Sequence, residues 1–399
     1  MLLYRQCLLV SFLILAQINT VSAVTEPFTP VTPDVQPYYQ PNDNVEAGLW
    51  LQLDKAEQAL KHSPKRINDE KLNAYVNKII CRLAEDYCQD IRLYIVRAPF
   101  FNAQMAPNGM MIIWSGLLLR VDNEDQLAAV IGHELGHYLK RHTLNNLIDR
   151  KNKRNLSAFL TIGLAALGVA PAASITDFIL MASIFAHTRE QESEADKYGI
   201  QLMRKAEYDI REAANVWDAM IEEDKAVKAN DSKEVGVPFF ATHPPSEDRS
   251  KTLSLYAEQL RIIENPPTPP THKQFVETVA TFWSTFLEDQ VLLNQPKRTE
   301  YLLQTLVSKE KLPGTIHYYN GELLRQRNEE GDIKLAEKEY ITAIQYSDAP
   351  NFAYRELGLV LLKQKRFQEA HSYFNNYLEY APDANDREMI EYYLSMEPN

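Results

Sequence analysis

The run VIGHELGHYLKRH, residues 130–142, holds the side chains best suited to chemistry. At about 100° per residue of helix, His133 and His137 lie on one face a turn apart, as two ligands of one metal ion must. Glu134 stands beside the first of them, where a carboxylate can act as a base. His142 is nine positions from His133, so a continuous helix places it on the opposite side, and we expect it at the solvent side near the helix end.

This spacing is the H-E-x-x-H arrangement of zinc proteases, in which the glutamate is the general base. A catalytic zinc ion needs a third protein ligand and one open position. The best source is TREQESEADKYGI, residues 188–200, where Glu192 and Asp196 lie four apart on one helix face. We predict Glu192 as the third ligand and Asp196 as the carboxylate that accepts a hydrogen bond from a ligand histidine. Glu190 and Glu194 are expected to form a solvated charged face.

Two small residues indicate how these helices meet. Gly136, in the middle of the motif helix, costs about 1 kcal/mol relative to alanine. That cost is explained if another backbone must approach closely there. Ala195 in the second helix is small enough to permit such a contact.

The elements that carry these residues predict a mostly α fold with a small β-sheet. Residues 24–64 are expected to form an N-terminal arm and a first helix. The proline-rich part, 24–44, is expected to be extended, with disorder as the alternative. A helical pattern follows the predicted cap Asn68. Residues 91–96 and 110–114 are predicted strands, with a loop between them that ends in the Asn108–Gly109 turn. Helices then follow, with caps at Ser115 and at Asp122 or Asn123, and an extended substrate is expected to pair with the strand edge near 108–113.

The first 23 residues do not belong to the predicted fold. Arg5 precedes the apolar run CLLVSFLILA, and Val21 and Ala23 are the small residues before a signal-peptidase cleavage site. We therefore expect export to a bacterial periplasm with cleavage after Ala23. An uncleaved anchor is the alternative, although the run is shorter than a membrane span.

Removal of this signal leaves two cysteines, Cys81 and Cys88. An even pair in an exported protein favours a disulfide, here between the end of one helix and the turn before the next strand. Two buried thiols are the alternative.

Composition limits the partners of the chain. With 399 residues, of which 45% are hydrophobic, two or three domains are expected. A net charge of -12 argues against nucleic-acid binding, which needs a basic surface.

The most apolar segment after the signal is 156–186, interrupted at Pro171. Each half is too short to span a bilayer. One interpretation is a buried helical pair or a lid beside the site. The other is an amphipathic hairpin that makes peripheral contact with a membrane or with an unfolded substrate.

A proline-rich break at 264–272 separates the predicted protease domain, 65–265, from an all-α domain at 273–399. Residues 350–384 follow the tetratricopeptide template of about 34 residues, and residues just upstream match it in part as a second, degenerate repeat. The small residues Gly358 and Ala370 allow two antiparallel helices to approach closely. Such repeats bind partner proteins, although a plain helical packing module is the alternative.

The combined pattern resembles peptidase family M48, the gluzincin metallopeptidases related to the CAAX prenyl protease and the HtpX heat-shock protease. The resemblance rests on His133-Glu134-x-x-His137, on Arg189-x-x-Glu192-x-x-Ala195-Asp196, and on NAQMAPNGMMIIWSGLL and THPPSEDR. It covers roughly residues 65–255. Thr188 departs from the serine that is commoner before the arginine.

The export signal and the repeat tail resemble the periplasmic β-barrel assembly-enhancing subgroup of this family. The resemblance implies one zinc ion per subunit and endopeptidase activity on misfolded or stalled outer-membrane proteins. It also implies contact between the repeats and the barrel-assembly machinery. His243 is implied to lie near the cleft, either as an oxyanion-stabilising residue or as a fourth, inhibitory ligand; a plain turn residue before Pro244 is the alternative. Arg249 is expected to anchor this loop through acidic partners.

A second class of function stays open at this point. The chain could be a non-catalytic periplasmic chaperone or scaffold that acts through its helical repeats and keeps a latent zinc site. The intact Glu134 argues against that interpretation, because a dead site does not need a base.

Overall fold

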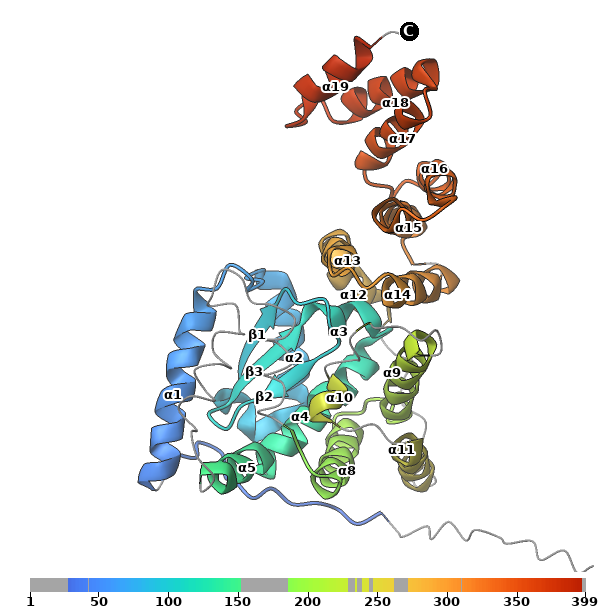
Figure 1. Ribbon diagram of the computed structural model, residues 1–399. Helices are drawn as coiled ribbons and strands as arrows, with labels where there is room; N and C mark the ends of the chain where they lie inside the picture. Colours follow the sequence, from blue (N-terminus) through green and yellow to red (C-terminus); the bar gives the residue numbers. More distant parts are fainter. Residues whose placement is uncertain are drawn as a thin grey trace, which may run out of the picture.

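The computed structural model describes residues 28–41, 43–151, 186–228, 234, 239–243, 247–261, 272–309 and 311–396. The elements of the first region are α1 (Asn44–Lys61), α2 (Glu70–Ala84), η1 (Glu85–Asp90), β1 (Arg92–Val96), β2 (Ala103–Met105), β3 (Met110–Trp114), α3 (Ser115–Arg120), α4 (Glu124–Leu139), α5 (His142–Lys151), α8 (Arg189–Lys205), α9 (Glu212–Lys228), α10 (Phe239–Thr242) and α11 (Glu247–Arg261). The tail consists of α12 (His272–Val279), η4 (Ala280–Phe282), α13 (Trp283–Leu292), α14 (Pro296–Ser308), α15 (Pro313–Arg327), α16 (Asp332–Ala343), α17 (Phe352–Lys363), α18 (Phe367–Tyr380) and α19 (Arg387–Leu394). The predicted fold class, mostly α with a small sheet, is confirmed (Figure 1).

The sheet has the strand order β1-β3-β2. β1 is parallel to β3, with Arg92 opposite Met110, and β2 is antiparallel to β3, with Ala103 opposite Ile113. The two predicted strands are present, but the loop predicted between them contains β2. Three residues of strand inside ten loop residues are too short a pattern to recognise from alternation. Gly109, at φ 87°, makes the predicted turn between β2 and β3.

The alternation of side chains along β3 separates two apolar cores. Met111 and Ile113 face α2 and α4, in the large core that continues into the tail. Met110, Ile112 and Trp114 face the other way, toward apolar residues of α1 and α5. The three-stranded sheet is therefore covered on both faces by helices, with α1 along one side of the protease region in Figure 1.

Capping side chains explain where the helices begin. The carboxylate of Asp69 accepts a hydrogen bond from the backbone of Leu72, so Asp69 caps α2 and the predicted cap Asn68 is one residue early. Asn123 caps α4, one of the two predicted residues. Ser115 is not a cap, because its hydroxyl instead hydrogen-bonds the backbone of Ala98.

The arm is extended but not disordered over residues 28–41, because a series of hydrogen bonds holds it across the protease region. Its backbone N–H groups donate to Gln259 of α11, to Gln201 of α8, to the backbone of Leu139 at the end of α4, and to Asp90 of η1. The arm therefore connects α4 and α8, the helices that carry the predicted ligands, with α11 and η1.

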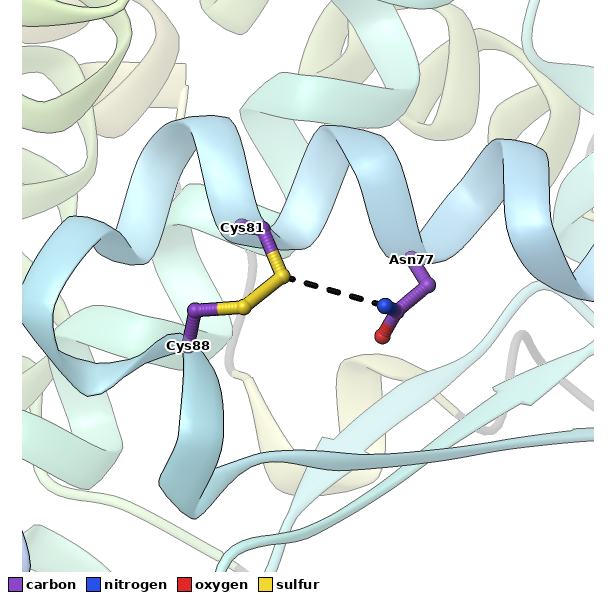
Figure 2. Close-up of a disulfide and its surroundings, with 3 residues drawn as sticks. All are labelled: Asn77, Cys81 and Cys88. Atoms are coloured by element: carbon purple, nitrogen blue, oxygen red, sulfur yellow. Dashed lines mark hydrogen bonds between the residues drawn. A yellow bond between two sulfur atoms is a disulfide. The ribbon is translucent and has the colours of Figure 1, made fainter.

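Cys81 of α2 and Cys88 of η1 form the predicted disulfide, and the side-chain amide of Asn77 lies 3.8 Å from the Cys81 sulfur (Figure 2). The bond closes a short loop at the point where α2 ends and the chain turns toward β1. Closing a loop of this length stabilises the fold by about 2.5 kcal/mol through the entropy of the unfolded chain.

The tail is a series of packed helix pairs that extends away from the protease region (Figure 1). In the pair α15 and α16, a Cβ atom at Gly321 would lie 2.4 Å from the ring of Tyr340. In the pair α17 and α18, a Cβ atom at Gly358 would lie 2.5 Å from the ring of Phe374. Ala370 is fully buried, as its predicted contact role requires. The identification of these pairs as tetratricopeptide repeats, and the predicted domain boundaries, stay predictions.

Buried charges join the tail to the protease region. Glu223 of α9 accepts hydrogen bonds from Arg120 of α3, at 2.8 Å, and from Arg298 of α14, at 2.7 Å. Arg120 also donates to Gln290 of α13. All of these side chains are buried. Burial raises the pKa of Glu223, but the two guanidinium groups outweigh it and hold that pKa below its ordinary value.

None of the helices in the described part of the chain has the length and apolar character of a membrane span. The predicted signal at 1–23 lies outside the described residues, as does the proline-rich break at 264–272 except for His272. The apolar segment 156–186 lies outside them as well, except for Ala186, so both interpretations of it stay open.

Candidate metal centre

Helices α4 and α8 carry the predicted ligands, and small residues let the two backbones touch. A Cβ atom at Gly136 would lie 2.7 Å from the carbonyl oxygen of Ala195. A Cβ atom at Gly199 would lie 2.9 Å from the backbone nitrogen of His133. The predicted reason for Gly136 is therefore correct: a larger residue cannot stand where the second helix passes. Thr188 caps α8 through a capping box with Gln191, so its departure from serine leaves the cap intact.

This contact brings His133, His137 and Glu192 together in a buried cluster with His243, in which one ligand atom of each lies within 4.8 Å of the others. The Nε2 atoms of the two motif histidines are 3.0 Å apart. The carboxylate oxygens of Glu192 lie 3.5 Å from His133 Nε2 and 3.4 Å from His137 Nε2.

These separations fit a small cation. Ligand atoms of a tetrahedral zinc site, with bonds of about 2.0–2.1 Å, lie about 3.3 Å apart, and the observed separations are within a few tenths of an ångström of that value. Two imidazoles and one carboxylate are also a donor set typical of catalytic zinc. Burial raises the pKa of Glu192, but His243, Arg249 and His137 hold it well below its ordinary value, so the carboxylate is ionised and ready to bind a cation.

A carboxylate and a guanidinium fix the His133 side of the cluster. His133 Nδ1 lies 2.9 Å from Asp196, as predicted for the carboxylate behind a ligand histidine. Arg249 donates two hydrogen bonds to Asp196, contacts Glu192 at 2.5 Å, and stacks on Trp217 with its Cζ 3.6 Å from the ring centroid. The expected acidic partners of Arg249 are thus Asp196 and Glu192.

The same carboxylates change the protonation of His133. Burial lowers its pKa and so does Arg249, but the hydrogen bonds with Asp196 and Glu192 raise it to about 9. Without a cation, His133 therefore holds a proton at neutral pH that a bound metal would have to displace.

Glu134 lies beside the cluster rather than in it. Its side chain is buried, and its Oε1 atom accepts no hydrogen bond in the described part of the chain; His243 Nε2 lies 3.4 Å from this oxygen. Burial raises the pKa of Glu134 to about 8, although His133 and a hydrogen bond from the backbone of Met105 oppose this shift. Without a cation, this carboxyl therefore holds a proton at neutral pH. A bound cation would lower the pKa and ionise the carboxyl, and its oxygen without a hydrogen bond could then accept a proton.

His243 follows the short helix α10, where its backbone N–H donates to the carbonyl of Phe239 and its ring stacks on the Phe239 ring. Its Nδ1 atom lies 3.2 Å from His133 Nε2 and 3.0 Å from Glu192 Oε1. That atom stands at the fourth corner of the cluster, where a catalytic site keeps its open position. Burial lowers the pKa of His243, so the ring is neutral and able to act as a ligand.

The prediction for His142 is wrong. The motif helix ends at Leu139, and Arg141 adopts a left-handed conformation with φ 56°. The chain turns back there, so His142 is buried, with its Nδ1 3.0 Å from His137 Nδ1. Its Nε2 lies 3.0 Å from Glu194, which is therefore not simply a solvated residue as predicted. The motif has no helix-breaking residue at 140 or 141, so the sequence pattern did not reveal this turn.

His187 is a further residue that the sequence reasoning missed. Its ring stacks on the ring of His137, with centroids 3.7 Å apart and planes 20° from parallel, and its centroid is 5.6 Å from that of His243. Its only sequence signal is its position directly before the cap of α8, which does not by itself distinguish it from a loop histidine.

Comparisons with known proteins identify the family of the segment that contains this centre. The model of peptidase family M48 matches residues 66–257, which include all the residues of the cluster. The chain is 26% identical over 227 residues to the mitochondrial metalloendopeptidase OMA1 of Schizosaccharomyces pombe, covering 54% of this chain and 64% of that protein. It is 31% identical over 154 residues to OMA1 of Saccharomyces cerevisiae, covering 38% of this chain and 42% of that protein.

The second named group among the relatives is bacterial. The β-barrel assembly-enhancing protease of Escherichia coli is 26% identical over 211 residues, covering 51% of this chain and 42% of that protein. The matched segments thus span less than two thirds of the length of these three relatives. The predicted family is confirmed: residues 66–257 of this chain form a domain of peptidase family M48.

Proposed function

We propose that this chain is a zinc-dependent endopeptidase in which His133, His137 and Glu192 hold one zinc ion and Glu134 is the general base. The observation that carries the proposal is the buried cluster of two imidazoles and a carboxylate. Beside it lies a base, one oxygen of which has no hydrogen-bond partner among the described residues. A zinc ion bound there would supply Lewis-acid polarisation of a peptide carbonyl and of a water molecule. The family match and the metalloendopeptidase names of the relatives support this reaction class.

The protein's own groups divide the remaining work. Glu134 accepts the proton that the attacking water loses, at the Oε1 atom that has no hydrogen bond in the described part of the chain, and returns it to the leaving amine. Asp196 and Arg249 keep the His133 ring and Glu192 oriented. Asp196 is thus a positioning residue in this proposal.

The substrate lies extended along the outer edge of β2. The strand edge expected at 108–113 cannot serve, because β3 is the central strand and both of its edges are paired. In the β2–β3 ladder, Trp114 donates to the carbonyl of Asn102 and Ala106 donates to the carbonyl of Met110. Hydrogen-bonded and non-hydrogen-bonded residues alternate along an antiparallel strand, so the backbone N–H and C=O groups of Ala103 and Met105 point away from β3. They point toward the side on which the backbone of Met105 contacts Glu134.

His243 acts in this proposal as a cap on the fourth position. Its Nδ1 atom lies where a substrate carbonyl would have to approach, at 3.0 Å from Glu192 and 3.2 Å from His133. Cleavage therefore requires that His243 moves aside. The other role implied by the resemblance, stabilisation of the oxyanion, makes the opposite prediction for its removal.

The substrates are misfolded or stalled outer-membrane proteins of a bacterial periplasm, reached after export with cleavage behind Ala23. The barrel assembly named for the Escherichia coli relative supports this substrate class. The helix pairs at 313–380 would then bind the barrel-assembly machinery, as tetratricopeptide repeats bind partner proteins. An extended substrate that is read through its backbone suits unfolded clients of varied sequence.

The test is cleavage of an unfolded protein, such as reduced casein, by the zinc-loaded chain. Glu134→Gln should keep zinc but lower kcat by a factor of about 10²–10⁴, because it removes the base and not a ligand. His243→Ala should raise kcat if the residue is a cap and lower it if it holds the oxyanion. Zinc binding with unchanged cleavage by Glu134→Gln would overturn the mechanism. A wild-type chain that binds zinc, cleaves nothing and still supports outer-membrane assembly would favour the scaffold alternative.

A further inference from the structure

We propose that His142 and Glu194 form a positioning relay for His137, so that the two motif histidines are oriented by two different devices. The inference rests on the proposed zinc site. His142 is 3% exposed and belongs to neither the H-E-x-x-H motif nor the ligand cluster, yet its ring contacts the outer nitrogen of a ligand.

The tautomers in this relay follow from one requirement. His137 Nε2 faces Glu192 and His133, so it is the nitrogen that binds the metal, and a neutral His137 must carry its proton on Nδ1. His137 Nδ1–H then donates to His142 Nδ1, 3.0 Å away. His142 in turn carries its proton on Nε2 and donates it to Glu194 Oε2, also 3.0 Å away. Each donor in the chain therefore meets one acceptor, with the carboxylate at the end.

The turn that delivers His142 is itself held in place. Arg141 is in the left-handed region at φ 56°, where residues other than glycine are uncommon. Its guanidinium pairs with the buried Glu46 of α1 at 2.7 Å and lies over the ring of Tyr39 in the arm. A helix end that was only frayed after Leu139 would not make these contacts. They hold the turn that brings His142 back against His137.

Lys140 holds the end of the relay. Its ammonium group contacts Glu194 Oε1 at 3.1 Å, which leaves Oε2 for His142. The same group contacts Asp34 of the arm at 2.9 Å. Each oxygen of Glu194 thus has a separate partner, and the carboxylate is fixed although its side chain is 40% exposed.

The relay would fix the orientation and the tautomer of His137, as a carboxylate does directly for other ligand histidines. Removing such a partner typically weakens metal binding 10- to 100-fold. Zinc affinity measured by competition with a chelating dye tests this without reference to cleavage. His142→Leu should weaken zinc binding about 10- to 100-fold. His142→Asn should recover most of the affinity, because its amide oxygen can accept from His137 Nδ1–H.

Glu194→Gln should weaken zinc binding several-fold, since the amide is a poorer acceptor for His142. Glu190→Gln is the matched control: it removes a carboxylate one turn earlier on the same helix, on an exposed residue outside the relay, and should leave the affinity unchanged. Melting of each metal-free variant shows that it is folded. Nitrogen-15 spectra of the zinc-loaded, histidine-labelled chain should show His142 protonated on Nε2 and bare on Nδ1.

The outcomes separate this inference from the proposed function. A wild-type chain that binds no zinc overturns both. A wild-type chain that binds zinc, with His142→Leu folded and binding equally tightly, overturns the relay alone. An equal loss of zinc affinity in His142→Asn and His142→Leu also overturns the relay, because a residue that only fills space would give that result. A proton on His142 Nδ1 in the spectra overturns it as well.

Discussion

Buried glycines do different work in the two regions of the molecule. Between α4 and α8, the space at Gly136 is taken by the backbone of Ala195, and the space at Gly199 by the backbone of His133. In the tail, the space at Gly321 and at Gly358 is taken by an aromatic ring. The first kind of contact joins two backbones, and the second joins a backbone to a side chain.

The difference explains how firmly each region positions its parts. A helix backbone cannot rotate away from a new methyl group, so these glycines are required for the close approach of α4 and α8 that brings three ligands from two helices together. A ring can tilt, so the helix pairs of the tail tolerate small changes of geometry. That tolerance suits a packing module in which each pair contacts its neighbours.

The largest expected effect lies where the two regions join. Glu223→Gln leaves Arg120 and Arg298 buried without their shared carboxylate, and should lower the free energy of unfolding at pH 7 by about 3–5 kcal/mol. Chemical denaturation followed by circular dichroism measures this. A loss below about 1 kcal/mol would mean that the junction does not couple protease and tail.

The same variant gives a pH dependence with a definite sign. The folded-state pKa of Glu223 is below its ordinary value of 4.5, so its contribution is present above that value and is lost as pH falls through the folded-state pKa. The difference in stability between wild type and Glu223→Gln should therefore shrink as pH falls below about 4.5. A difference that stayed constant down to pH 3 or so would contradict the ionised assignment.

Gly136→Ala tests the backbone contact. Its methyl group would lie 2.7 Å from a carbonyl oxygen, so we expect a loss of about 3 kcal/mol in unfolding free energy, the upper end for overpacking, together with weaker zinc binding. Gly48→Ala is the matched control: this glycine is in helix α1 with nothing within 4 Å of the new atom. It should gain about 0.5–1 kcal/mol. Similar effects of the two changes would refute the close-contact explanation.

Gly358→Ala should have a smaller effect, about 1–2 kcal/mol, because the ring of Phe374 can shift. We expect no change in zinc affinity, since the tail contributes no residue to the cluster in the described part of the chain. Thermal melting and the dye competition assay together measure both. A loss of unfolding free energy as large as that of Gly136→Ala would show that backbone–ring contacts are no more tolerant than backbone–backbone contacts.

Sequence reasoning succeeded where a short periodic pattern carries the information. The pairing of His133 with His137 follows from a four-residue spacing on one helix, and the two longer strands follow from runs of apolar residues. It missed strand β2, which has three residues. It also placed the cap of α2 at Asn68, one residue before the observed cap Asp69. In each failure the local pattern was too short to outweigh its neighbours.

The sequence by itself determined the ligand types, their helical spacing, the small residues at the α4–α8 contact and the cysteine pair, because each depends on residues within a few turns of each other. Only the tertiary structure decided where the side chains of His142, His187 and His243 lie. Their positions depend on a left-handed turn at Arg141 held by Glu46, and on loops whose packing partners are far away in the chain. Such contacts have no period, so no local pattern encodes them.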